Sequence, residues 1–69
     1  MITLAEQLAE ARRELALRRS AYPAWVKAGK LTHEEAYHQL AAMAEIVRTL
    51  QRLDVEQRQL SLFAEKESL

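Results

Sequence analysis

The stretch Pro23-Ala24-Trp25-Val26-Lys27-Ala28-Gly29-Lys30-Leu31-Thr32 contains the only proline and the only glycine of the 69-residue chain. Proline suits the first position of a helix and glycine suits the left-handed residue just past a helix end, so residues 23–29 are expected to form one short helical turn. On both sides the sequence is rich in Ala, Leu, Glu, Gln and Arg, which are strong helix formers. The composition therefore predicts two long helices joined by a single connection over residues 23–31.

The first helix is predicted over residues 4–22. Thr3 and Glu6 form a capping box, in which the Thr hydroxyl accepts from the third helical amide and the Glu can reach back. Pro23 disfavours helical geometry at the residue before it, so the helix is expected to end or kink at Tyr22. Apolar residues at heptad-like spacing mark one face: Leu4, Leu8, Ala11, Leu15 and Tyr22.

The second helix is predicted over residues 33–65, behind a second capping box of Thr32 and Glu35. No helix-breaking residue follows in the sequence. The apolar residues form one stripe of Ala36, Leu40, Met43, Val47 and Leu50, and a second, slightly rotated stripe of Met43, Ile46, Leu50, Leu53, Leu60 and Ala64. Together they make a wide apolar face that can contact more than one neighbouring helix.

These elements predict an all-α fold, an antiparallel helical hairpin forming a single domain over residues 1–69. At 1.5 Å per residue the first helix is about 29 Å long and the second reaches about 50 Å, so apolar positions from Leu53 onward are left uncovered. A chain this short has a marginal core, and without cysteines it gains no disulfide. We therefore expect a homodimer in a four-helix arrangement, unless the last ten to fifteen residues are not helical in the free protein. The expected dimer core comprises Leu40, Met43, Ile46, Val47, Leu50, Leu53 and Leu60.

Charge and hydropathy exclude several classes of function. Ten basic and ten acidic residues cancel, which argues against a dedicated nucleic-acid or anionic-membrane binder. No apolar run approaches the roughly 20 residues needed to cross a bilayer. The start of the chain also lacks the pattern of a signal peptide. We expect a cytoplasmic protein, acting in the host cytoplasm if it is encoded by a phage.

The sequence predicts neither catalysis nor a metal or cofactor site. His33 and His38 stand five residues apart, whereas two metal-binding histidines on one helix face need a spacing of four. No cysteine, glycine-rich phosphate loop or Ser-His-Asp set is present. The glutamates of the first helix have arginines within reach, so they are interpreted as a solvated face.

Two features are candidates for binding another protein. Arg12, Arg13 and Arg19 belong to a basic cluster, and arginine is favoured at interfaces because its planar fork binds carboxylates. The alternative is that these cations only complement the dipole of the helix end. Tyr37 lies on the edge of the apolar stripe and is expected to remain accessible. Tyr22 and Trp25 are expected to be buried at the end of the hairpin.

The string Gln59-Leu60-Ser61-Leu62-Phe63 resembles the bacterial sliding-clamp-binding motif, and every position matches. The resemblance implies an extended peptide in which Leu60, Leu62 and Phe63 enter an apolar groove and Gln59 supplies an orienting hydrogen bond. In the alternative interpretation the segment is helical and Leu60 belongs to the dimer core.

The pattern Tyr22-Pro23-x-Trp25-Val26-x-x-Gly29-Lys30-Leu31-Thr32, followed by Ala36, Met43, Ile46 and Thr49-Leu50, resembles a family of small phage and prophage proteins. Length and hairpin form are also similar to those of phage anti-activators of quorum sensing. That resemblance implies a helical dimer that binds and inhibits a host protein, either the DNA-binding domain of a LuxR-type regulator or a type IV pilus assembly ATPase. Two alternatives are a replication-associated adaptor on the sliding clamp and a helical dimer that binds nucleic acid.

Overall fold

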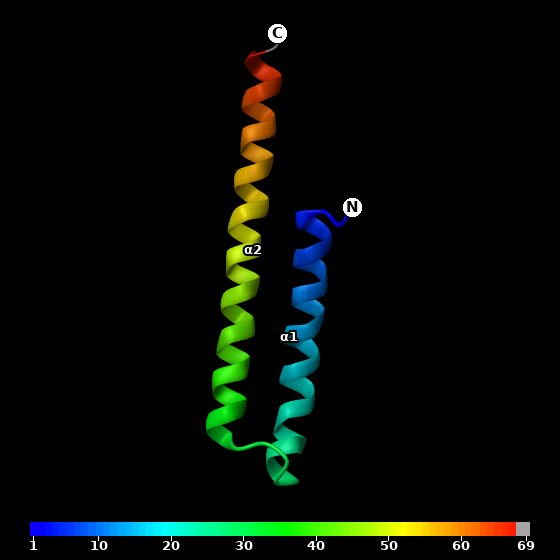
Figure 1. Ribbon diagram of the computed structural model, residues 1–69, viewed down its shortest axis with the longest axis vertical. Coiled ribbons are helices and arrows are strands. Elements are labelled where there is room, and N and C mark those ends of the chain that lie inside the picture. Colours follow the sequence, from blue (N-terminus) through cyan, green and yellow to red (C-terminus); the bar gives the residue numbers. More distant parts are fainter. Residues whose placement is uncertain (68–69) are drawn as a thin grey trace.

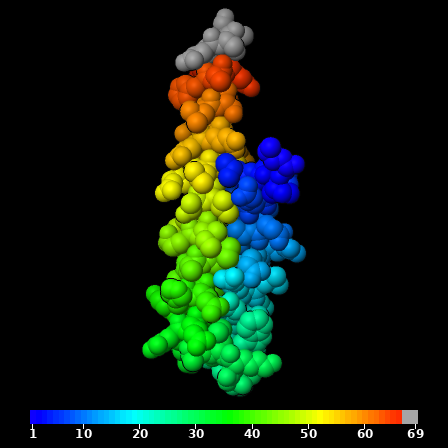
Figure 2. All heavy atoms as spheres, viewed as in Figure 1, coloured from blue at the N-terminus to red at the C-terminus, as the bar shows by residue number. Residues whose placement is uncertain are grey.

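The computed structural model describes residues 1–67 and consists of two helices, α1 (Leu4–Lys27) and α2 (His33–Glu67). The helices lie side by side and antiparallel, joined by the short connection of residues 28–32 (Figure 1). The expected all-α hairpin is confirmed. Because α2 is 35 residues long and α1 is 24, the C-terminal part of α2 projects beyond the start of α1. In Figure 2 the orange and red part of α2 extends beyond the blue start of α1, with no part of α1 beside it.

Both predicted capping residues are confirmed at the starts of the helices. The backbone N–H of Glu6 donates to the Thr3 hydroxyl oxygen at 3.1 Å, and that of Glu35 donates to the Thr32 hydroxyl oxygen at 3.0 Å. Each threonine therefore satisfies one of the amide groups that a helix start leaves without an intrahelical partner. The two caps fix where the helices begin.

The end of α1 differs from the predicted end at Tyr22, because the helix continues through Pro23 to Lys27. An internal proline removes one backbone hydrogen bond, but Tyr22 just before it is buried and its hydroxyl bonds to Gln39 of α2. The turn after Pro23 is mostly exposed, and backbone hydrogen bonds from Ala28, Gly29 and Lys30 hold it in helical form. The predicted short turn of residues 23–29 is thus the last part of α1 rather than a separate element.

Gly29 ends α1 in the left-handed conformation expected for it, with φ at 75°. The Gly29 N–H donates to the carbonyl of Val26 at 3.0 Å, and the Lys30 N–H donates to that of Trp25 at 2.9 Å. This pair of bonds defines a Schellman motif, which satisfies carbonyls at a helix C-terminus. The motif reverses the chain sharply enough for α2 to return along α1.

The core is a single seam between the helices. At its centre Met43 packs with Ala11 and Leu15, and partly buried side chains close the cluster on α2. The α2 side of this seam consists of Ala36, Leu40, Met43, Val47 and Leu50. Continued at the same spacing of three and four residues, the seam next meets Asp54, Gln57 and Ser61. The side of α2 that faces α1 therefore becomes polar where α1 begins.

Asp54 marks this change and is buried, with its side chain 10% exposed. Its carboxylate pairs with Arg58 Nη2 at 3.0 Å, one turn further along α2. The first turn of α1 lies beside this yellow part of α2 in Figure 1. The exposed N–H groups of a helix start favour a nearby negative charge, so a carboxylate suits this end of the seam.

The molecule is a rod of 60 × 19 × 16 Å with a radius of gyration of 17.1 Å. A globular domain of this length has a radius of gyration of about 11 Å. The rod exposes 5774 Å², whereas a monomeric protein of this mass exposes about 4,500 Å². Over residues 1–67, neither helix contains an apolar stretch suited to crossing a membrane.

Candidate functional site

The contacts of Gln39 define one flank of the hairpin. Arg18 Nη1 donates to the Gln39 backbone carbonyl at 3.3 Å, and the Tyr22 hydroxyl donates to Gln39 Oε1 at 2.9 Å. Residues seven apart lie on the same face of a helix. Ile46, Leu53 and Leu60 follow Gln39 at this spacing, so they extend the same flank along α2.

We call Ile46, Leu53 and Leu60 the apolar flank. Their side chains are exposed by 48%, 39% and 69% respectively. Ile46 lies beside α1 and is still half exposed, so the uncovered apolar surface begins before the part of α2 that projects beyond α1. The uncovered apolar surface therefore runs along the side of the hairpin and continues onto the projecting part of α2.

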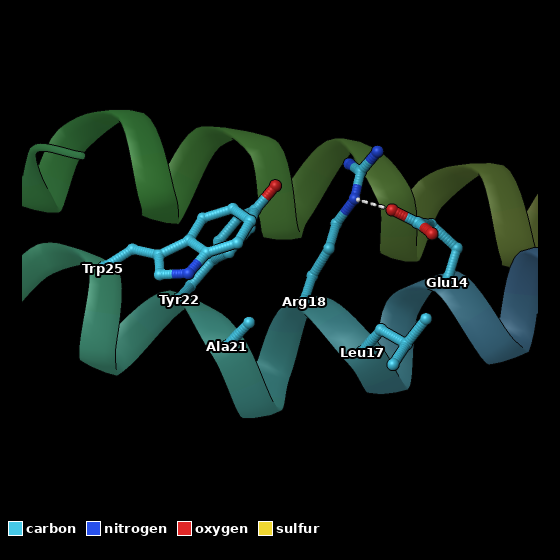
Figure 3. A pocket seen from close by; sticks show the side chains of 6 residues that line it. All are labelled: Glu14, Leu17, Arg18, Ala21, Tyr22 and Trp25. Atoms are coloured by element: carbon cyan, nitrogen blue, oxygen red, sulfur yellow. Dashed lines mark hydrogen bonds and ion pairs between the residues drawn. The ribbon is translucent and has the colours of Figure 1, made fainter. Parts of the chain in front are cut away.

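A shallow groove of 360 Å³ on α1 borders the same flank (Figure 3). Within it, Glu14 accepts a hydrogen bond from Arg18 Nε at 2.9 Å. The Tyr22 and Trp25 rings stack at a tilt, with centroids 5.4 Å apart. The groove is lined by Glu14, Leu17, Arg18, Ala21, Tyr22 and Trp25.

Trp25 corrects one of the sequence predictions. Tyr22 is buried as expected, but Trp25 is 47% exposed. Because α1 continues through Pro23, Trp25 lies on the same helix as Tyr22, three residues after it. Its side chain is outside the seam and covers the Tyr22 ring on the solvent side. Its exposed edge adds apolar surface to the groove.

The opposite flank carries the unpaired arginines. A second pocket of 390 Å³ joins the end of α1 to the start of α2, and its lining includes Pro23, Val26 and Tyr37. Arg19 precedes Pro23 by one turn and Arg12 precedes Arg19 by two, so both lie on the Pro23 side of α1. We call Arg12, Arg19 and Tyr37 the arginine flank.

Arg12 and Arg19 differ from the other arginines because neither forms an ion pair with any residue that the structure describes. Arg13, the third predicted partner-binding arginine, is turned away and bonded to Glu10, a hydrogen bond that raises the pKa of the Arg13 guanidinium. The remaining arginines pair along their own helices: Arg18 with Glu14, Arg48 with Glu45, Arg52 with Glu56, and Arg58 with Asp54. Tyr37 is 78% exposed.

The seven residues expected in the dimer core fall into two groups. Met43 is buried within the hairpin, and three others pack around it against α1: Leu40, Val47 and Leu50. These four are occupied by contacts within the chain. Ile46, Leu53 and Leu60 make up the apolar flank and have no such cover.

The clamp-like string lies within α2 and is helical. In a helix Leu60 and Leu62 point to nearly opposite sides, because two residues turn the helix by more than half a circle. A third shallow groove of 390 Å³ is lined by Gln59, Leu62, Phe63 and Lys66, without Leu60. The extended presentation that the motif requires is therefore not the conformation of this segment.

Among residues 1–67, no three or more His, Asp or Glu side chains are grouped so that they could hold a metal ion. His33 lines the pocket beside Tyr37, while His38 is exposed on α2. Comparison with family models, curated proteins and solved structures finds no match for the chain.

Proposed function

We propose that this chain is a small, non-catalytic protein-protein interaction module, encoded by a phage and dimeric, that binds and inhibits a host protein through its arginine flank. The observation that carries the proposal is that the guanidinium groups of Arg12 and Arg19 have no carboxylate partner among residues 1–67 and lie on the same flank as the exposed ring of Tyr37. Every other arginine of the hairpin has a carboxylate on its own helix.

The chemistry of this flank defines the surface that it fits. Arginine binds carboxylates through two parallel hydrogen bonds, and tyrosine adds contact area at a small entropic cost. The pocket beside Tyr37 can receive an apolar side chain. The complementary surface therefore carries acidic residues around an apolar anchor. The resemblance to phage anti-activators suggests two candidate host proteins, the DNA-binding domain of a LuxR-type regulator and a type IV pilus assembly ATPase.

The direct test is capture of these two purified host proteins by the immobilised chain. Replacing Arg12 and Arg19 together by Glu should weaken capture at least tenfold, because both cations then repel the acidic surface. Arg52→Glu is the matched control: it changes an arginine of α2 outside this flank and should leave capture unchanged. Capture that is insensitive to the Arg12 and Arg19 changes would refute this role for the flank.

The same variants separate protein binding from nucleic-acid binding. If the module instead held duplex DNA, binding would fall steeply with rising salt as counterions are released. DNA binding would also be lost in the variant with both Arg12 and Arg19 replaced by Glu, without any host protein present. We expect no salt-dependent retention of DNA, because the chain has no net charge.

Docking on the sliding clamp is the second candidate, and the exposure of Leu62 and Phe63 at the end of α2 favours it. It requires residues 59–63 to leave the helix on binding. Clamp capture that disappears in the Leu62→Ala, Phe63→Ala double variant, together with loss of helical circular dichroism in the complex, would support the adaptor. Capture of a host regulator by that same double variant would support the first proposal.

A further inference from the structure

The apolar flank has the symmetry of a surface that binds itself. Ile46 and Leu60 lie at equal distances of seven residues on either side of Leu53. In an antiparallel pair of identical helices, a two-fold axis at the middle residue brings that residue against its own copy and exchanges the outer two. We propose that two chains associate through α2, antiparallel, with Leu53 on the two-fold axis and Ile46 of each copy against Leu60 of the other.

The exposed area favours a second copy as the occupant. The rod exposes about 1,300 Å² more than is usual for its mass, while a stable interface buries about 800 Å² on each partner. A heptad-spaced stripe of Ile and Leu is the pattern that packs against another helix. The occupant must also present a stripe of matching length and spacing, which α2 itself provides.

Contact between the two α2 helices alone is too small for a stable dimer. A helix face about 10 Å wide and about 40 Å long offers on the order of 400 Å², half of what a stable interface needs. In the proposed register, the projecting part of α2 from one copy runs beside residues 40–51 of the other. That position is next to the end of the groove lined by Glu14, Leu17 and Arg18 (Figure 3). The projecting segment can therefore lie between α1 and α2 of the second copy and supply the missing area.

A second simple dimer, in which the two α1 helices meet end to end, is disfavoured by the polar end of the seam. In that arrangement α1 of the second copy would stack end to end on α1 of the first and cover the continuation of the seam. It would then bury the exposed Gln57 and Ser61 next to the Asp54 carboxylate, and burying polar side chains where an apolar contact could form is costly. The apolar side chains of the projecting segment include Leu60, which lies on the apolar flank and not on this continuation.

The register can be tested by cross-linking, because the chain has no cysteine. Leu53→Cys alone should be linked to a covalent dimer by a short bis-maleimide, since the two thiols meet at the axis. Ile46→Cys and Leu60→Cys should each cross-link poorly alone and efficiently when mixed. Val55→Cys, an exposed apolar position on another face, is the control that should remain uncoupled.

The mass in solution provides the second readout. The wild-type chain should sediment at twice its 8.0 kDa mass, and Leu53→Glu at the single mass with its helical circular dichroism retained. A wild-type monomer at 100 µM, or a dimer that persists in Leu53→Glu, overturns the inference. A dimer without the expected cross-links overturns the register.

This inference rests on the proposed dimer but not on the host protein. Loss of the dimer with host capture retained would reject only the association through α2. Cross-linking as expected with no host capture would reject only the proposed target.

Discussion

At the scale of single residues, Met43 is the side chain on which the hairpin core depends most. It is buried between Ala11 and Leu15 at the centre of the only seam in the described chain. Met43→Ala should lower the free energy of unfolding by about 2–4 kcal/mol, from lost burial and the cavity left behind. Urea denaturation at fixed protein concentration measures this. Leu62→Ala, which removes an exposed side chain of α2, should change it by less than about 0.5 kcal/mol.

Asp54 carries a prediction of a different kind, because it is a charge inside the seam. Its carboxylate is largely buried and bonded to Arg58, and this yellow part of α2 lies beside the start of α1 (Figure 1). Asp54→Asn keeps the shape but removes the charge, and should cost about 1 kcal/mol of unfolding free energy. Glu56→Gln is the control, since Glu56 forms an exposed pair with Arg52 at 3.9 Å and such pairs contribute little. Equal losses in the two variants would show that the position of Asp54 has no special effect.

At the scale of the elements, the hairpin depends on the Schellman motif at the end of α1. Gly29 has a φ of 75°, and no atom would lie within 4 Å of an added Cβ. The cost of Gly29→Ala is therefore a backbone cost, about 1 kcal/mol, equivalent to about 4–8 °C in Tm for a domain of this size. Gly29→Asn should lose less, because asparagine tolerates this conformation better. Helical circular dichroism during heating measures both.

Sequence predicted the elements best where local chemistry decides the structure. The threonine caps and Gly29 were correctly assigned because each acts through backbone groups within a few residues. Pro23 was misjudged because its local penalty competes with burial of Tyr22 against α2, a contact far away in sequence. Trp25 was misjudged for the same reason, since its exposure follows from the continuation of α1 through Pro23.

The two flanks illustrate the same limit for the candidate site. The residues themselves were found from spacing, namely Arg12, Arg19, Tyr37 and the stripe through Leu53. The spacing did not predict that these residues lie on opposite sides of the hairpin, because that depends on which edge of α1 faces which edge of α2. The contacts of Gln39 with Arg18 and Tyr22 show which edges meet, and a glutamine on a helix gives no such signal in sequence.

At the scale of the whole molecule, the proposed dimer would couple the folding of this narrow rod with one seam to its association. If the second copy covers the apolar flank, the dimer is stabilised by mass action and its Tm rises with protein concentration. Each tenfold increase in concentration should add about 1.4 kcal/mol to the stability of the dimer. Thermal unfolding of the wild-type chain between 1 and 100 µM should therefore shift by several degrees. In Leu53→Glu the Tm should be lower and independent of concentration, because that hairpin unfolds alone. A wild-type Tm that does not change over this range would mean that the hairpin is stable without a second copy and that the apolar flank is free to bind another protein.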